Sequence, residues 1–414
     1  MVKIKEFRGL RPTADMVEEV ASPPYDVLNS AEARARVKGK PYSFLHVVKP
    51  EIDLPEDTAL YDEVVYRKGK ENLDKFISDK VLIQDPRPAF YFYRLIMGDT
   101  NQTGLVAGAS IDDYANNVIK KHERTRVDKK ADRIKHVDTL NANTGPVFLT
   151  YRARGEMDAL TDEAVQTKPL YDFTAEDGIR HTLWKVDDLK TVAKIREIFS
   201  GIDYLYVADG HHRSASGTKV GQQRRAENSS HTGEEEYNYF LSVIFPHDQL
   251  RIMDYNRVVR DLNGLSRGDF LSLVSQKFEI APAPVGSPYR PETPHNFGMY
   301  LDGQWYRLTA KAGSFPEDNP VGSLDASILQ ENLLSPILGI GDPRKDNRID
   351  FVGGIRGLDE LVRKVDGGEA VAFSLYPTSI GQLMDVADRG LVMPPKSTWF
   401  EPKLRSGIIV HLLD

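Results

Sequence analysis

The sequence predicts a mixed α/β fold: a central core with further α/β segments on its N-terminal and C-terminal sides. Between residues 89 and 263, runs rich in aromatic and β-branched residues alternate with segments of helical periodicity. The same alternation returns over residues 349–387. The chain has 414 residues, which is too long for one ordinary hydrophobic core, so we expect more than one domain.

The individual strands and helices are predicted from the local spacing of apolar residues. Apolar runs bounded by turn residues predict strands over 2–7, 43–48, 89–96, 103–111, 147–151, 170–173, 182–186, 204–208 and 239–245. Apolar residues at helical spacing predict helices over 31–37, 57–79, 127–140, 156–167, 189–199 and 214–225. Ser30 and either Asp187 or Asp188 are suitable N-caps for two of these helices.

The character of the chain changes near residue 264. A helix is predicted over 270–278, followed by a proline-rich connector over 281–294. Residues 297–308 form a predicted hairpin with Asp302-Gly303 at its tip. We therefore expect an N-terminal α/β segment over 1–88, a core over 89–263 and a C-terminal α/β domain over 264–414.

Composition narrows the function classes. The chain is 40% hydrophobic and 28% charged, with a formal net charge of −7. It shows no broad basic stripe, so we expect no nucleic-acid partner. It has no cysteine, which excludes disulfides and thiolate catalysis. The charged first residues and the lack of long apolar runs predict a cytoplasmic protein without a membrane partner.

The main candidate site follows the strand predicted over 204–208. It reads Asp209-Gly210-His211-His212-Arg213 and continues with Ser214 into a predicted helix. Asp209 is a suitable N-cap, and Gly210 permits a tight turn. Backbone N–H groups at a helix N-terminus attract anions, and histidine and arginine add donors for phosphate. The alternative is a capped helix with exposed histidines.

Two further polar clusters are candidates for the same site. His122, Glu123 and Arg124 precede the helix predicted over 127–140, where a carboxylate beside basic groups can act as a general base or hold a metal ion. Asn143 follows that helix, as a ligand contact or a C-cap. Near the C-terminus, Lys396, Ser397 and Thr398 offer one charge and two hydroxyls for a phosphate or carboxylate. The alternative for this last cluster is a structural strap.

Taken together, these motifs resemble a bacterial and archaeal family known only as domain of unknown function 1015. The resemblance rests on His122 to Thr125, Asp132-Arg133, Asn143 to Pro146, the segment from Ala208 to Arg213, and Met393 to Thr398 with Pro402-Lys403. It covers nearly the whole chain and implies no activity.

The turn at residues 209–213 also resembles, more distantly and over roughly residues 90–260, the phosphate-binding turn of the ParB/sulfiredoxin-like fold. That group includes nucleotide-binding ParB proteins, sulfiredoxin and free-serine kinases. The resemblance implies that Gly210, His211, His212 and Arg213 bind phosphate and that Glu123 is a base. Sulfiredoxin chemistry is excluded because it needs a cysteine.

The favoured hypothesis is phosphoryl transfer from ATP or ADP with Mg²⁺ to a small hydroxylated metabolite, with serine as the choice by analogy. Glu123, Asp209 and His211 are then the catalytic candidates, and Asp209 or Glu123 holds the metal. One alternative is a nucleotide-binding regulator of ParB type. The other is a metal-dependent phosphatase or hydrolase. We expect all three clusters to line one cleft, and the sequence leaves the oligomeric state open.

Overall fold

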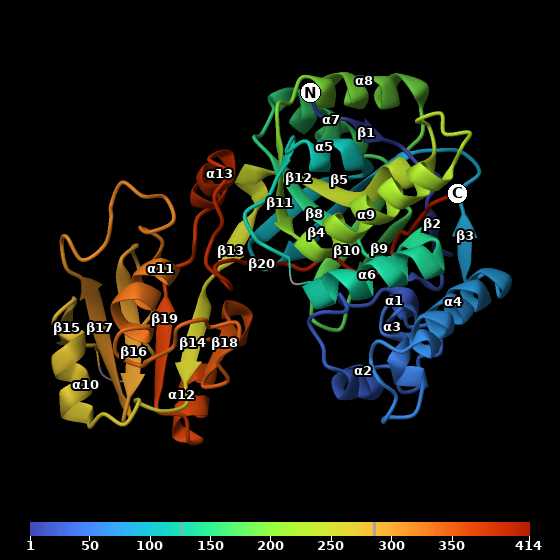
Figure 1. Cartoon of the computed structure of the whole chain (residues 1–414). Coiled ribbons are helices and arrows are strands. Elements are labelled where there is room, and N and C mark those ends of the chain that lie inside the picture. Colours follow the sequence, from blue (N-terminus) through green and yellow to red (C-terminus); the bar gives the residue numbers. More distant parts are fainter. Residues whose placement is uncertain (126, 285–286) are drawn as a thin grey trace. The chain divides into compact units, whose positions relative to one another are not determined.

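The structure is a computed structural model that describes residues 1–125, 127–284 and 287–414. It divides the chain into two compact units (Figure 1). Unit 1 consists of residues 1–250 and 402–414, and unit 2 of residues 251–401. The division into three parts that the sequence suggested remains a prediction.

Unit 1 is built on a large mixed sheet. Nine strands of its described residues form the sheet, in the order β6-β11-β8-β12-β5-β4-β10-β9, with β1 paired to β5. These strands are β1 (Ile4–Lys5), β4 (Phe90–Met97), β5 (Thr100–Ser110), β6 (Ile119–Lys120), β8 (Val147–Tyr151), β9 (Tyr171–Thr174), β10 (Arg180–Val186), β11 (Leu205–Asp209) and β12 (Tyr239–Pro246). β11 runs parallel to β6 and antiparallel to β8. The predicted mixed α/β fold is therefore confirmed.

Helices and short strand pairs complete unit 1. The helices are α1 (Val17–Val20), α2 (Ser30–Arg36), α3 (Leu45–Val48), α4 (Glu63–Ser78), α5 (Ile111–Ala115), α6 (Val127–Leu140), α7 (Gly155–Ala164), α8 (Leu189–Ser200) and α9 (His211–Glu227). The short pairs are β2 (Leu10–Pro12) with β3 (Leu82–Gln84), and β7 (Ala142–Asn143) with β21 (His411–Leu412). Figure 1 shows α6 and α9 side by side, and residues of the two helices are in contact.

Some local predictions in this unit were wrong. Residues 43–48 were expected to form a strand, but Leu45–Val48 is the helix α3. Its side chains belong to a buried apolar cluster with α4, and Asn72 of α4 donates to the His46 carbonyl at 2.7 Å. The N-cap of α2 is Asn29 rather than Ser30, because the Asn29 side chain accepts from the Glu32 amide and Glu32 returns the bond as a capping box. Asp188 caps α8 as predicted.

Unit 2 has a sheet of its own. In its described part, six strands take the order β15-β17-β16-β19-β14-β18. They are β14 (Tyr255–Val259), β15 (Phe278–Pro282), β16 (Asn296–Leu301), β17 (Gln304–Ala310), β18 (Ile349–Gly353) and β19 (Val371–Leu375). Its helices are α10 (Arg267–Val274), α11 (Asp325–Leu329), α12 (Asp359–Asp366) and α13 (Ile380–Asp388). The hairpin of β16 and β17 turns at Asp302-Gly303 as predicted, both with positive φ.

Unit 2 begins and ends on neighbouring strands. β13 (Arg251–Met253) pairs antiparallel with β20 (Trp399–Glu401), and Arg251 lies opposite Glu401. The chain therefore enters and leaves unit 2 at adjacent points. No helix in the described parts of either unit has the length and apolar character needed to cross a membrane.

Candidate functional site

The candidate site is built on β11, a glycine turn and α9. The register between β11 and β8 shifts between Val207 and Asp209, which marks a bulge at the end of the strand. Gly210 follows with a φ of 95°, in the left-handed region that favours glycine, and α9 begins at His211. Among the described residues, no side chain caps α9. Uncapped N–H groups in the first turn of a helix attract anions.

Asp209 is not the N-cap that the sequence suggested. It is the last residue of β11, and its Oδ1 accepts from the Gly210 amide at 2.8 Å. Its Oδ2 lies 3.1 Å from Lys403 Nζ and 3.8 Å from the Arg213 guanidinium. Burial by itself raises the pKa of Asp209, but Lys403 and Arg213 outweigh burial and hold that pKa far below its ordinary value. Asp209 therefore stays ionised and is a poor proton donor or acceptor.

Arg213 is the third residue of α9 and lies in its first turn. Its side chain is 11% exposed, and its NH1 group donates to the Pro146 carbonyl. Burial lowers its pKa, but the neighbouring Asp26, Asp209 and Tyr25 reverse this and raise the pKa overall. Arg213 is thus a permanent cation at the start of the helix.

A histidine pair lies at the same helix start. The rings of His122 and His211 meet edge to face with their centroids 4.4 Å apart, and both side chains are buried. Burial lowers the pKa of His122 to about 4, although Asp209 and the Val207 backbone act in the opposite direction. Burial and the neighbouring His122 lower the pKa of His211 well below its ordinary value. Both rings are neutral at pH 7.

Glu123 lies beside this pair. Its Oε2 is 3.9 Å from His211 Nδ1, and its side chain is 49% exposed. The other ring nitrogen of His211, Nε2, is buried without a hydrogen-bond partner among the described residues. The structure therefore brings the first two predicted clusters together, with the Glu123 carboxylate and the unpartnered His211 Nε2 at the helix start.

The remaining predicted residues of unit 1 differ in their surroundings. His212 is half-buried and Arg124 is exposed. Ser214 is fully buried, and its hydroxyl donates to the carbonyls of Gly210 and His211 within α9, so its hydrogen bonds are already used by the helix. Asn143 is buried in β7, and its Nδ2 has no partner among the described residues.

The third predicted cluster belongs to unit 2. The Lys396 carbonyl accepts from Arg257 NH2 at 3.0 Å, and Lys396 Nζ lies 5.4 Å from the centre of the Tyr255 ring. Ser397 donates to the Pro394 carbonyl at 2.7 Å, and its own carbonyl accepts from Thr378. Thr398 follows as a half-buried residue. The meeting of these residues with Asp209 and Arg213 remains a prediction.

Several neighbours of the site were not among the predicted site residues. Lys403, which pairs with Asp209, is distant from it in the chain, and its only sequence signal was its place in the family-like motif Pro402-Lys403. Arg133 lies over the Tyr25 ring, 4.3 Å from its centre. Asp26 is one of the charges that raise the pKa of Arg213. The loop with Pro23 and Pro24, whose local pattern fitted a loop corner as well as a site role, therefore approaches Arg213.

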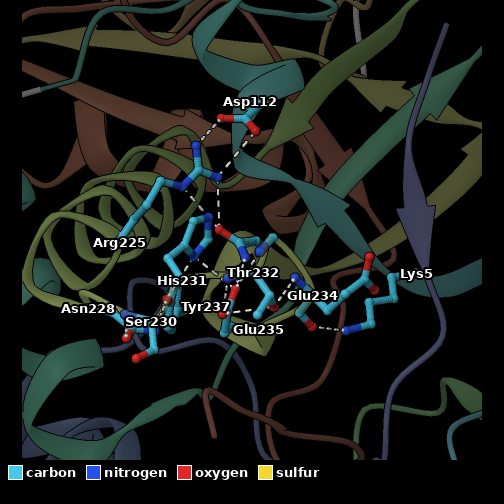
Figure 2. Close-up of polar contacts among 12 residues, drawn as sticks. Lys5, Asp112, Arg225, Asn228, Ser230, His231, Thr232, Glu234, Glu235 and Tyr237 are labelled. Carbon is cyan, nitrogen blue, oxygen red and sulfur yellow. Dashed lines mark hydrogen bonds and ion pairs between the residues drawn. The ribbon is translucent and has the colours of Figure 1, made fainter.

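The opposite end of α9 carries a larger hollow, of about 580 Å³, beside residues 227, 228 and 234–236. Figure 2 shows that Glu235, one of the carboxylates beside it, is already engaged by neighbouring groups. Glu235 accepts from Thr232 and from the Gly233 amide, and it lies 2.8 Å from His231. Glu236 pairs with Lys5 and with His411. Glu235 and Glu236 therefore stabilise the loop after α9. We regard the start of α9, around His211 and Arg213, as the better candidate site.

The comparisons with known proteins place the chain in a family. It belongs to the family described as "Protein of unknown function (DUF1015)", whose model matches residues 4–327. This confirms the family resemblance seen in the sequence. No curated protein matches the chain.

Solved structures match at low similarity. A free serine kinase mutant in complex with ADP is 14% identical, with 77% of this chain and 92% of that chain covered and a TM-score of 0.37. A conserved hypothetical protein from Pyrococcus furiosus is 14% identical, with 77% and 95% covered and a TM-score of 0.36. SbnI with a C-terminal truncation, from Staphylococcus aureus, is 11% identical, with 72% and 82% covered and a TM-score of 0.38. At these scores the likeness carries no functional argument.

Proposed function

We propose that the site at the start of α9 binds the phosphates of ATP or ADP and that the protein transfers a phosphoryl group to a small hydroxylated molecule. The observation that carries the proposal is that an uncapped helix N-terminus, the cation Arg213 and the unpartnered His211 Nε2 occur together at the start of α9. The helix N–H groups and Arg213 are donors, and the neutral His211 ring adds a third donor in the tautomer that is protonated at Nε2, a combination that suits phosphate oxygens.

The residues present also fit a magnesium ion. Mg²⁺ keeps several waters and usually takes one or two protein carboxylates together with substrate phosphates. Asp209 is the carboxylate that would hold it, which leaves Glu123 for proton transfer, and the ion would neutralise charge on the phosphates when bound. Over the described residues, no group of three or more His, Asp or Glu side chains is arranged to hold a metal. The hydrolase alternative, which needs such a group, therefore gains no support.

The proposed roles follow from charge and position. Arg213 and the first-turn N–H groups neutralise the phosphates, and neutral His211 donates from Nε2. Glu123 accepts the proton of the attacking hydroxyl group, whose oxygen forms the new bond to phosphorus while the bond to the leaving phosphate breaks. Asp209, held ionised by Lys403, orients Arg213 and would also hold the metal.

The test is calorimetry with ATP and ADP in the presence of Mg²⁺. We expect wild-type protein to bind and Arg213→Ala to lose about 1.5–3 kcal/mol of binding free energy, because one charge-assisted contact is removed. Arg180→Ala is the matched control, since Arg180 is 54% exposed and pairs with Asp172 at the surface of unit 1. Wild-type protein that binds neither nucleotide would refute the proposal.

A further inference from the structure

A small cavity lies beside Arg213 within unit 1. It has a volume of about 30 Å³, and its lining includes Arg133 of α6, Arg213 of α9, Asn143 and Tyr25. A single water needs about 10–15 Å³ measured in this way. The cavity therefore has room for about two water-sized groups, the size of the two oxygens of a carboxylate.

The lining of this cavity offers hydrogen-bond donors that the protein does not use. Asn143 is 6% exposed, and its Nδ2 is buried without a partner among the described residues. The Arg133 side chain is 12% exposed, and its Nε donates to Asp132 Oδ2 at 2.8 Å. Within the described part of the chain, this is the one hydrogen bond that the Arg133 guanidinium makes. An unpaired buried donor such as Asn143 Nδ2 is costly, so a ligand with an acceptor oxygen would stabilise it, and the Arg133 guanidinium would add a charge-assisted contact.

A second, larger pocket adjoins the first. It has a volume of about 200 Å³ and shares Tyr25, Val48, Arg133 and His136 with the small cavity. This volume lies below the roughly 300–1,000 Å³ that is usual for drug-sized ligands. The two pockets together therefore suit a molecule of few heavy atoms, with an anionic end in the small cavity.

The larger pocket contains one carboxylate, Asp26, whose charge acts on Arg213 without a direct hydrogen bond or ion pair among the described residues. Glu51 pairs with Lys49 at 2.9 Å, and Asp132 accepts from Tyr66 at 2.9 Å as well as from Arg133. Asp26 lines the pocket and is exposed, and no hydrogen bond or ion pair to its side chain is formed by the described residues. An acceptor in this position can receive a hydroxyl or ammonium group of the same small molecule.

We propose that these adjoining pockets are the acceptor-substrate subsite, in which Arg133 and Asn143 hold the carboxylate of a small hydroxy acid while Asp26 receives its hydroxyl or amino group. The inference rests on the proposed function, and it gives the acceptor a chemical class. Arg213 lines the small cavity and also carries the proposed phosphate site, so the acceptor lies next to the group to be transferred.

The test uses four probes on the full chain: glycerate and L-serine, which carry a carboxylate, and glycerol and ethanolamine, which do not. Binding is followed by calorimetry, with and without ADP and Mg²⁺. We expect at least one carboxylate probe to bind and both neutral or cationic probes to fail. Tighter binding of serine than of glycerate would indicate that Asp26 receives the ammonium group of the ligand. Tighter binding of glycerate would indicate that it receives a hydroxyl group.

Arg133→Gln should weaken binding of the carboxylate probe by about 10- to 100-fold, because it removes a charge-assisted contact. Arg180→Gln, an exposed arginine paired with Asp172, should leave it unchanged. If Arg133→Gln does not fold, the wild-type comparison of the four probes still decides the question. Equal binding of all four probes, or no binding with and without ADP, would overturn the inference.

The same titrations separate the two proposals. If ADP binds and no carboxylate probe does, the subsite is wrong and the phosphate site stands. If a carboxylate probe binds in an Arg133-dependent manner and neither nucleotide binds, the subsite stands and the proposed phosphoryl transfer is wrong.

Discussion

Buried histidines determine how unit 1 should respond to acid. His181 has no exposed surface, and it lies between Tyr93, whose hydroxyl is 2.8 Å from Nδ1, and Arg405, which donates to Nε2 at 3.3 Å. Burial, helped by the charge of Arg405, lowers the pKa of His181 to about 3. The ring is therefore neutral in the folded protein under ordinary conditions.

Because the pKa of an unfolded histidine is about 6.5, the unfolded chain binds more protons than the folded chain below that pH. Stability is therefore retained above pH 6.5 and lost as the pH falls toward 3. Between pH 7 and pH 5, one such histidine costs about 2 kcal/mol. Wild-type protein should lose about 2 kcal/mol more unfolding free energy between pH 7 and pH 5 than His181→Gln, which lacks this histidine. Denaturant unfolding at the two pH values measures the difference. An equal loss in both proteins would contradict the assignment.

For single residues, the sequence indicated which side chains have suitable chemistry, but it did not indicate their protonation states or their exact positions. It selected His122, His211 and Asp209 because of their residue types and their place in the chain. It suggested Asp209 as a helix cap, whereas the bulge in β11 places this carboxylate at the strand end, against Lys403. Burial and distant charges decide protonation, and neither can be read from neighbouring residues.

At the scale of the element, the turn between β11 and α9 depends on Gly210. A Cβ at this position would lie 3.1 Å from Arg213 Nε and 3.2 Å from its Cζ, and the φ is 95°. An alanine therefore meets both backbone strain and a displaced guanidinium. The strand, the turn and the helix could all be predicted, because Asp-Gly between an apolar run and a helical pattern is a strong local signal.

We predict that Gly210→Ala lowers the free energy of unfolding by about 1–2 kcal/mol and weakens ADP binding, since Arg213 must move. Gly98→Ala is the control. Gly98 also has a positive φ, 55°, but a Cβ there would have no atom within 4 Å. It should lose stability by strain alone and keep its affinity for ADP in calorimetry. Equal affinities in Gly210→Ala and wild type would show that Arg213 does not contact the phosphates.

Other elements show where local signals fail. Residues 43–48 contain two adjacent valines, which favour a strand, yet they form α3 because their apolar side chains pack into the cluster with α4. The approach of Tyr25 and Asp26 to Arg213 likewise joins segments far apart in the sequence. Such pairings depend on tertiary packing, which single-sequence patterns do not encode.

At the scale of the whole molecule, unit 2 is an insertion into unit 1. The last residues return to unit 1, where β21 pairs with β7, Val410 pairs with Leu10, and Lys403 pairs with Asp209. Residues directly opposite in an antiparallel pair have Cα atoms about 4.5–5.5 Å apart. Because Arg251 lies opposite Glu401, the two ends of unit 1 left by removing unit 2 are close enough to be joined by a short linker.

We predict that replacing residues 251–401 by about four glycine and serine residues leaves a protein that unfolds in one cooperative transition and binds ADP within about threefold of wild type. The reason is that Asp209, His211, Arg213 and Lys403 all belong to unit 1. Thermal unfolding by circular dichroism and calorimetry with ADP are the measurements, and unit 2 alone is the control that should not bind. A large loss of affinity in a folded unit 1 would instead assign unit 2, with Lys396, Ser397 and Thr398 as its candidates, a direct part in holding the nucleotide.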